Sequence, residues 1–166
     1  STDTESLGTS SFRWKDLFLS GGVYLGGTTS VNKLDDYEEG NWTPEIKGIS
    51  TAGDYSGKTQ VGKYTKVGRL VPCFFIFDGS SGTGSGNFEL QGLPFTVQSG
   101  TGGIAVLQYN SGLDIPTGFN TPILYLRPTL TTAETRCTSD GTAGHQPIPY
   151  PTNATFVRAT FSYITT

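Results

Sequence analysis

The side chains best suited to catalysis or metal binding are few and far apart in this sequence. His145 is the single histidine, and the two cysteines, Cys73 and Cys137, are 64 positions apart. A Ser-His-Asp triad needs a histidine held between a nucleophile and a carboxylate, and a structural zinc site needs about four nitrogen or sulfur ligands. We therefore expect an exposed loop histidine, no metal, no cofactor and two free thiols, with a single disulfide as the alternative for the cysteines.

Acidic residues are the next candidates for chemistry. A dense acidic run in residues 33–40 lacks the alternating spacing and the glycine of a calcium loop, so we interpret it as a solvated connector or one helical turn. A glycosidase needs two carboxylates on either side of a cleft. Five carboxylates elsewhere could supply such a pair, although no motif surrounds them: Asp78, Glu89, Asp114, Glu134 and Asp140. We therefore predict that the chain is not an enzyme.

Saccharide binding is a better match to the available residue types. Aromatic faces stack on the C–H side of sugar rings, while amides, carboxylates and arginines bind the hydroxyl groups. Three stretches of the second half of the chain combine these types, and their candidate residues are Tyr109, Asn110, Tyr125, Arg127, Asp140, His145 and Tyr150. Each aromatic residue among them could instead belong to a core or an interface.

The composition limits which elements can position these side chains. Glycine supplies 23 of the 166 residues, charged residues only 15%, and methionine is absent. This composition argues against helical bundles, and the 12% of aromatic residues argues against disorder. The net charge of −3 predicts no nucleic-acid binding, and the lack of a long apolar run predicts no membrane insertion. Because methionine is absent, we also expect a piece of a longer protein.

Residues 42–166 show the pattern of short strands separated by turns. Gly68-Arg69 separates two apolar stretches, which predicts a tight hairpin, and Pro72 predicts an edge strand or a bulge. Residues 73–77 form a continuous apolar run, as in a strand covered on both faces, and residues 79–86 read as a flexible glycine-rich loop. We predict an all-β fold, an antiparallel, jelly-roll-like β-sandwich.

The final strand offers the clearest alternation. Val157, Ala159, Phe161 and Tyr163 would face one side, while Arg158, Thr160 and Ser162 would face the other. The first group is apolar and the second polar. We therefore predict that the first group lies in the core.

Residues 1–41 form a separate zone that cannot bury its own apolar side chains. Phe12, Trp14, Leu17 and Leu25 lie in brief patches between glycine pairs. So short a segment has too little chain to cover residues of this size. These side chains therefore need a partner, either the domain at residues 42–166 or another copy of the chain.

Four blocks of the first 95 residues resemble a known family. Residues 7–27 read LGTSSFRWKDLFLSGGVYLGG and residues 32–44 read NKLDDYEEGNWTP; GKYTKVGRLV and GLPFT follow at residues 62–71 and 92–96. These blocks are similar to segments of bacteriophage tail fibres and tailspikes, where they precede or begin a C-terminal head domain. The resemblance implies a homotrimer at the tip of a virion appendage. Phe12, Trp14, Leu17 and Leu25 would then lie in the trimer interface.

The residues and the resemblance together lead to a functional prediction. We expect a short intertwined trimerising neck, residues 1–41, followed by a β-sandwich head, residues 42–166. Its predicted role is to bind a host cell-surface receptor, a saccharide, during adsorption, with three sites acting by avidity. The alternatives are a purely structural trimerisation and folding cap of the fibre or, less favoured, a fragment of a polysaccharide depolymerase.

Overall fold

The computed structural model describes residues 6–139, 141 and 144–166, and it divides into two compact units. The first unit is Ser1–Asp35 and the second is Asp36–Thr166. In the first unit, β1 (Val23–Tyr24) pairs with β2 (Lys33–Leu34), and a short 3₁₀ turn, η1 (Ser30–Asn32), lies between them. Among the described residues of this unit, β1, η1 and β2 are the regular secondary structure.

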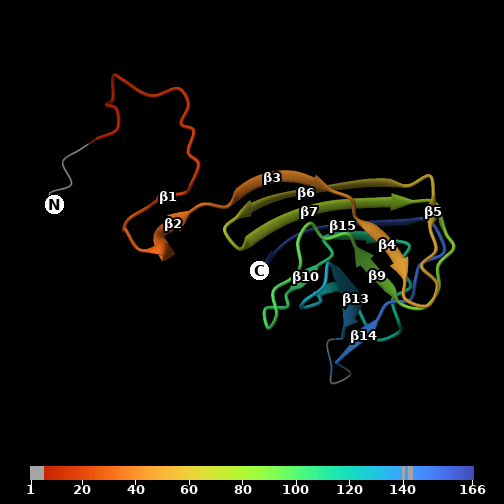
Figure 1. Cartoon of the computed structure of the whole chain (residues 1–166). Helices are drawn as coiled ribbons and strands as arrows, with labels where there is room; N and C mark the ends of the chain where they lie inside the picture. The colour runs from red at the N-terminus through yellow and green to blue at the C-terminus, as the bar shows by residue number, and fades with distance from the viewer. Residues whose placement is uncertain (1–5, 140, 142–143) are drawn as a thin grey trace. The chain divides into compact units, whose positions relative to one another are not determined.

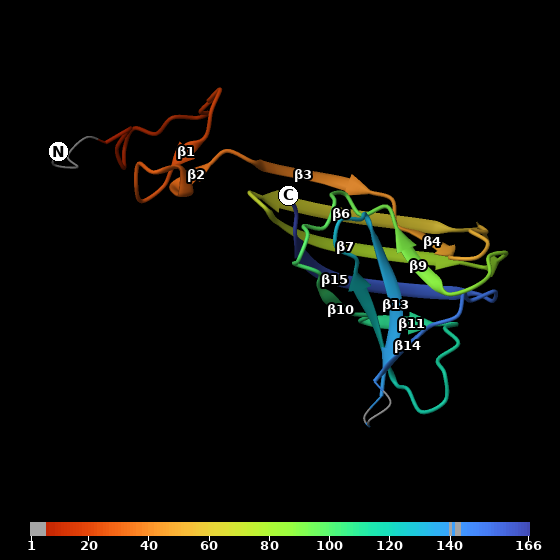
Figure 2. The ribbon, with the colours of Figure 1, turned by 60° about the horizontal axis from the view of Figure 1, so that its bottom comes forward.

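The second unit is a sandwich of two antiparallel sheets (Figures 1 and 2). Sheet I contains β3 (Tyr37–Trp42), β6 (Thr59–Val67), β7 (Leu70–Gly79), β11 (Tyr109–Ser111) and β15 (Thr155–Ile164), in the order β11-β15-β7-β6-β3. Sheet II contains β4 (Glu45–Gly48), β9 (Phe88–Gln91), β10 (Ile104–Val106), β12 (Thr121–Leu126), β13 (Thr132–Thr138) and β14 (His145–Pro147). Its order is β10-β12-β13-β9-β4, with β14 also paired to β13. The predicted all-β antiparallel sandwich is confirmed.

The core lies between the two sheets, whose strands run across one another in Figure 2. Sheet I contributes large aromatic side chains, and the ring of Trp42 lies 5.9 Å from that of Phe75. Sheet II contributes aliphatic side chains such as Leu90, Leu124 and Leu126, which are fully buried. Burying a large apolar side chain contributes roughly 1.5–3 kcal/mol, so this interface between the sheets supplies the main stabilisation of the sandwich.

Strand β15 shows the predicted alternation. Val157, Ala159, Phe161 and Tyr163 are buried, whereas Arg158, Thr160 and Ser162 are exposed. The hydroxyl of Tyr163 donates to the carbonyl of Phe95 at 3.0 Å and accepts from the Phe95 amide at 3.0 Å. The inward face therefore also ties β15 to the segment that leads into β10.

The acidic stretch at residues 33–40 is not a connector or a helical turn. It contains β2 and most of β3, and β3 pairs with β6 from Tyr37–Val67 to Trp42–Gly62. Acidic side chains of this stretch have partners on β6. The Tyr64 hydroxyl donates to Glu38 at 2.8 Å, and Lys66 pairs with Asp36. The division of the structure into two compact units falls between residues 35 and 36.

Strand β7 differs from expectation in two respects. It lies in the middle of sheet I, between β15 and β6, so Pro72 is not on an edge strand. The β6–β7 ladder omits the pair at Pro72, where the missing N–H could not contribute a hydrogen bond. The strand is also covered on one face only, since Cys73, Phe75 and Phe77 are buried while Phe74 and Ile76 are partly exposed.

Residues 79–86 are packed and do not form a flexible loop. β5 (Tyr55–Ser56) pairs with β8 (Ser81–Gly82) in a small third sheet. The ring of Tyr150 lies against Gly82 and Gly84, where any Cβ would clash with it. Glycine at these positions lets backbone pack directly on an aromatic ring.

The predicted β6–β7 hairpin is confirmed, and Gly68 has the φ of 56° that the first position of its turn requires. Both Cys73 and Cys137 are buried free thiols. Among the described residues, no helix is long and apolar enough to cross a membrane.

Candidate functional site

The outer face of sheet II carries a row of polar side chains on adjacent strands. Tyr125 on β12 lies opposite Glu134 on β13, and Glu134 lies opposite Glu89 on β9. Strand alternation determines this orientation, because the neighbours Leu124 and Ala133 point into the core. The register therefore brings an aromatic ring and two carboxylates together from three strands.

Arg127 joins the two carboxylates. Its Nη1 lies 3.2 Å from Oε1 of Glu89, and its Nε lies 3.5 Å from Oε1 of Glu134. Glu89 is only 7% exposed, so its charge is largely removed from water. A buried carboxylate is tolerated when a cation and hydrogen bonds compensate for the lost solvation, and Arg127 supplies both.

A second arginine completes the cluster. Arg136 donates to Oε2 of Glu134 from Nε at 2.9 Å and from Nη2 at 2.6 Å. Its guanidinium also lies over the ring of Tyr125, 5.3 Å from the ring centroid. Arg136 therefore fixes both an acidic and an aromatic member of the row.

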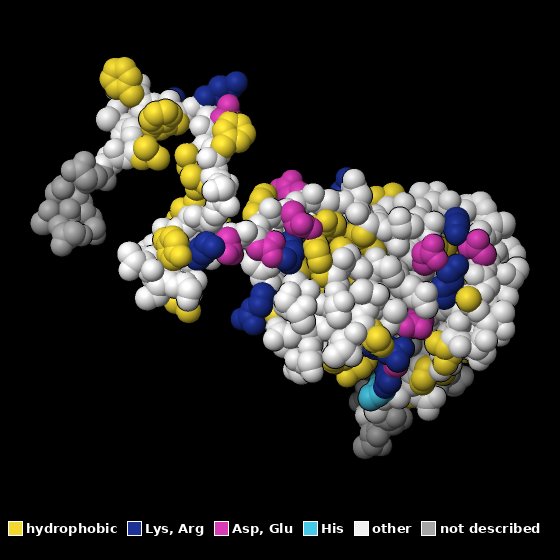
Figure 3. All heavy atoms as spheres, in the orientation of Figure 1, with side chains coloured by type: hydrophobic (Ala, Val, Ile, Leu, Met, Phe, Trp, Pro, Cys, Tyr) yellow, Lys and Arg dark blue, Asp and Glu magenta, His cyan; other side chains and the backbone are white. Residues whose placement is uncertain are grey.

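Glu89, Arg127, Glu134 and Arg136 line a groove of about 530 Å³, and Tyr125 lies beside it, under the guanidinium of Arg136. The other walls include the last residues of β4, β9 and β14, which are Gly48, Gln91 and Pro147, and the loop residues Ile49 and Asn87. Basic and acidic side chains lie interspersed on the sandwich surface seen in Figure 3. We name this site, defined by Glu89, Tyr125, Arg127, Glu134 and Arg136, the sheet II groove. Its hydrogen-bonding groups suit hydroxyl-rich ligands.

The structure places the seven predicted saccharide-binding residues in different environments. Tyr125, 38% exposed, and Arg127 belong to the sheet II groove. His145 is exposed at the start of β14, where it pairs with Thr138 of β13. These three residues therefore lie on sheet II.

Of the other four predicted residues, only Tyr150 has a side chain in the described part of the structure, and it does not lie in the groove. Tyr150 is 6% exposed and packs on Tyr55 with ring centroids 5.4 Å apart, so its ring belongs to the core and not to a ligand platform. Tyr109 and Asn110 lie on β11 of sheet I, and their side chains are outside the described part of the structure. Asp140 also lies outside the described residues.

Three members of the groove were not among the predicted saccharide-binding residues. Glu89 and Glu134 are two of the five carboxylates considered above for a glycosidase pair, and no role was predicted for Arg136. Each occupies a polar position in an alternating strand, which is a signal present in the sequence. Only the pairing of β9, β13 and β12 shows that these positions share one row.

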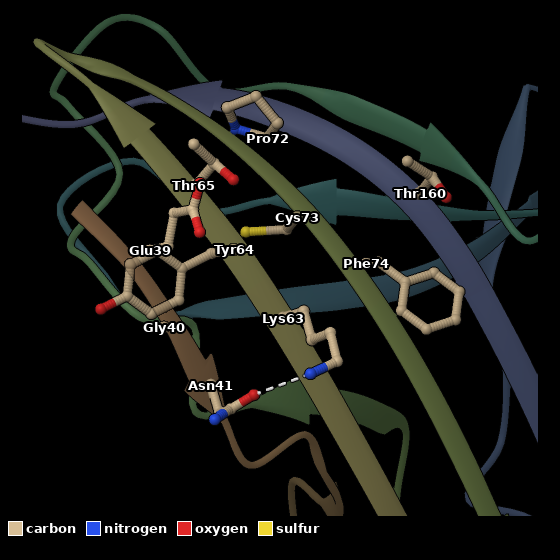
Figure 4. Close-up of a pocket in the computed structure, with 10 residues that line it drawn as sticks. All are labelled: Glu39, Gly40, Asn41, Lys63, Tyr64, Thr65, Pro72, Cys73, Phe74 and Thr160. Carbon is tan, nitrogen blue, oxygen red and sulfur yellow. Dashed lines mark hydrogen bonds between the residues drawn. The ribbon is translucent and has the colours of Figure 1, made fainter. Parts of the chain in front are cut away.

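A second hollow, of about 550 Å³, lies on the outer face of sheet I (Figure 4). Lys63 donates to Oδ1 of Asn41 at 3.2 Å there, beside the partly exposed ring of Phe74. Its charged side chains, Lys63 and Glu39, are exposed. This hollow lacks the buried ion pair that organises the sheet II groove.

The first unit displays large apolar side chains to solvent, as Figure 3 shows. The exposed fractions of Phe12, Trp14, Leu17 and Leu25 range from 57% to 79%. Folded chains rarely expose this much apolar surface without a use for it.

Comparison with known proteins adds one structural likeness. No protein-family model and no curated protein sequence matches the chain. Among solved structures, the chain is similar to the crystal structure of the Dettilon tailspike protein (gp208), with a TM-score of 0.59 and 18% identity. The match covers 77% of this chain and 24% of that chain. The β-sandwich is thus a fold that a phage tailspike contains, and the fold expected from the sequence resemblance is confirmed.

Proposed function

We propose that this chain is the C-terminal head module of a phage tail fibre or tailspike, located at the virion tip, and that it binds a saccharide of the host surface during adsorption. The sheet II groove carries the proposal. It presents two arginines and two carboxylates that hold one another in place, next to the partly exposed ring of Tyr125. Rigid polar groups beside an aromatic ring are what recognition of a polyhydroxylated ring requires.

The same geometry favours binding over hydrolysis. Retaining and inverting glycosidases both need one carboxylic acid that donates a proton to the leaving oxygen. In the groove, Glu89 accepts a hydrogen bond from Arg127, and Glu134 accepts from Arg136. Both carboxylates therefore act as acceptors, and we propose that the chain is not an enzyme.

We further propose that three copies associate through the first unit. Phe12, Trp14, Leu17 and Leu25 are exposed in the single chain, and burial against identical segments would remove them from water. Three grooves on one trimer would multiply a weak affinity by avidity. Multi-angle light scattering tests this point. A trimer mass is expected, and a monodisperse monomer would contradict it.

The binding proposal is tested with an array of bacterial surface polysaccharides. The wild-type protein should bind a subset of them, and Tyr125→Ala should weaken that binding about tenfold or more, because it removes the aromatic ring beside the groove. Tyr37→Ala is the matched control, since Tyr37 is an exposed tyrosine on sheet I. Equal binding by Tyr125→Ala and the wild type would refute the assigned site.

The exposed apolar residues of the first unit favour a second candidate function, a structural cap that trimerises and folds the fibre. A cap would bind no polysaccharide, and its removal would prevent assembly of the parent fibre. Deleting residues 1–166 from the parent fibre, which removes the apolar first unit as well, and measuring its assembly by size-exclusion chromatography separates the two candidates. Loss of assembly together with an empty array would support the cap.

A further inference from the structure

We propose that the sheet II groove selects neutral saccharides and rejects acidic ones. This inference rests on the proposed function, because it specifies the ligand class of the same site. The observation that carries it is the pairing of charges inside the groove. Glu89 is bonded to Arg127 and Glu134 to Arg136, so the two basic groups are matched by two acidic groups.

An acidic sugar would need one of these arginines as its partner. Taking Arg127 away from Glu89 would leave a carboxylate that is 7% exposed without its cation. Removing one partner of a buried ion pair is strongly unfavourable, because the remaining charge keeps its desolvation penalty. An anion that left the pairs intact would instead lie beside both carboxylates and be repelled by them.

A neutral sugar avoids both penalties. A hydroxyl group donates and accepts, so it can add to the carboxylate oxygens and guanidinium N–H groups while the ion pairs stay formed. Tyr125, held by the guanidinium of Arg136, offers an apolar surface for the C–H side of the ring. The net charge of −3 acts in the same direction at long range, since it disfavours the approach of polyanions.

The first test compares neutral oligosaccharides with oligosaccharides that contain uronic or sialic acid on one array. We expect wild-type protein to bind neutral ligands only, with little change when the salt concentration is raised. Acidic ligands bound as strongly as neutral ones would overturn the inference and leave saccharide binding standing. Absence of binding to both classes would instead overturn the proposed function.

The second test uses a change of specificity. Glu89→Gln keeps the shape of the side chain but removes the buried charge partner of Arg127, which then keeps only its 3.5 Å contact with Glu134, so this variant should gain binding to an alginate oligomer, a polyuronate, measured by surface plasmon resonance. Glu39→Gln removes the same charge from sheet I and should gain none. Circular dichroism verifies that both variants are folded. No gain by folded Glu89→Gln would contradict the role assigned to the ion pair.

Discussion

Glu89 shows how one residue depends on its neighbours across the sheet. A glutamate in the middle of β9 is 7% exposed, an unusual environment for a charged side chain. Arg127 reaches it from the residue after β12, and Lys47 of β4 lies opposite it in the register on the other side. The carboxylate is thus stable in place because Arg127 brings a cation to it from the end of β12.

The Arg127–Glu89 pair predicts an asymmetric response to mutation. Arg127→Ala should lower the free energy of unfolding by about 2 kcal/mol, because Glu89 keeps its burial and loses its partner. The double variant Arg127→Ala/Glu89→Gln should recover part of that loss. Urea denaturation of the wild type and both variants measures this, and a double variant less stable than Arg127→Ala would argue against the pair.

The residue types of the site were predictable from the sequence to a limited degree. Tyr125 and Arg127 are candidates because an aromatic residue and an arginine, two residue types that bind saccharides, lie close together in the sequence. Tyr150 was selected on the same kind of evidence, but its ring packs on Tyr55. Nothing local distinguishes the two tyrosines, because burial depends on segments 95 residues away.

At the level of secondary-structure elements, the glycines in residues 79–84 allow the backbone to pack closely against aromatic rings. Gly79 lies against the ring of Tyr55, and Gly82 and Gly84 lie against the ring of Tyr150. The small β5–β8 sheet fixes this region, and the Tyr55 hydroxyl donates to the carbonyl of Pro151. The glycine-rich stretch therefore closes one end of the core instead of forming a mobile loop.

Gly84→Ala should be strongly destabilising for this reason. A Cβ at this position would lie 2.6 Å from the Tyr150 ring and 2.9 Å from the carbonyl oxygen of Ala52. Overpacking of this kind lowers the free energy of unfolding by about 1–3 kcal/mol. Gly141→Ala is the control, since its Cβ would meet nothing within 4 Å. Similar melting temperatures for the two variants would contradict this prediction, because they would show that the backbone around Gly84 moves to accept the added methyl group.

Strand β3 shows why the acidic run was misread. The four acidic side chains over residues 35–39 read as solvated surface, but all four find partners: Asp35 with Lys33, Asp36 with Lys66, Glu38 with Tyr64, and Glu39 with Tyr37. Two of these partners come from β6. A charged segment becomes a strand when a neighbouring strand supplies its hydrogen bonds.

At the scale of the whole molecule, ionisable groups buried in different elements link stability to pH. Burial raises the pKa of the Cys73 thiol from 9.0 to about 12, and it raises the pKa of Cys137, Tyr55 and Tyr163 as well. Each of these groups is neutral in the folded state over a range where the unfolded chain ionises. Their contribution to the free energy of unfolding is complete below the unfolded-state pKa and is lost as the pH rises above it.

We therefore expect the free energy of unfolding to fall above about pH 9, where thiols of the unfolded chain ionise, by up to about 1.4 kcal/mol per pH unit for each group. Guanidinium denaturation under reducing conditions at pH 7, 9 and 10 measures this loss. Replacing both Cys73 and Cys137 by Ala should flatten the profile between pH 9 and 10, where the tyrosines contribute little. An unchanged slope in the double variant would contradict the assignment.

The local features of this protein can be predicted from its amino-acid sequence. Alternation in β15, the turn at Gly68 and the low content of helix formers are short-range properties, and the all-β sandwich followed from them. The four family-like blocks likewise pointed to the fold that the Dettilon tailspike shares. The apolar patches of residues 6–35 indicated a unit with more apolar surface than it can cover.

Which distant residues contact one another depends on the three-dimensional pairing of the strands. The sheet II groove joins residues 89, 125, 127, 134 and 136 because β9, β13 and β12 are neighbours in one sheet. Long-range strand pairing also determines the burial of Tyr150, the central position of β7 and the pairing of β3 with β6. Strand order and register are set by the total packing of both sheets, and no short stretch of sequence contains that information.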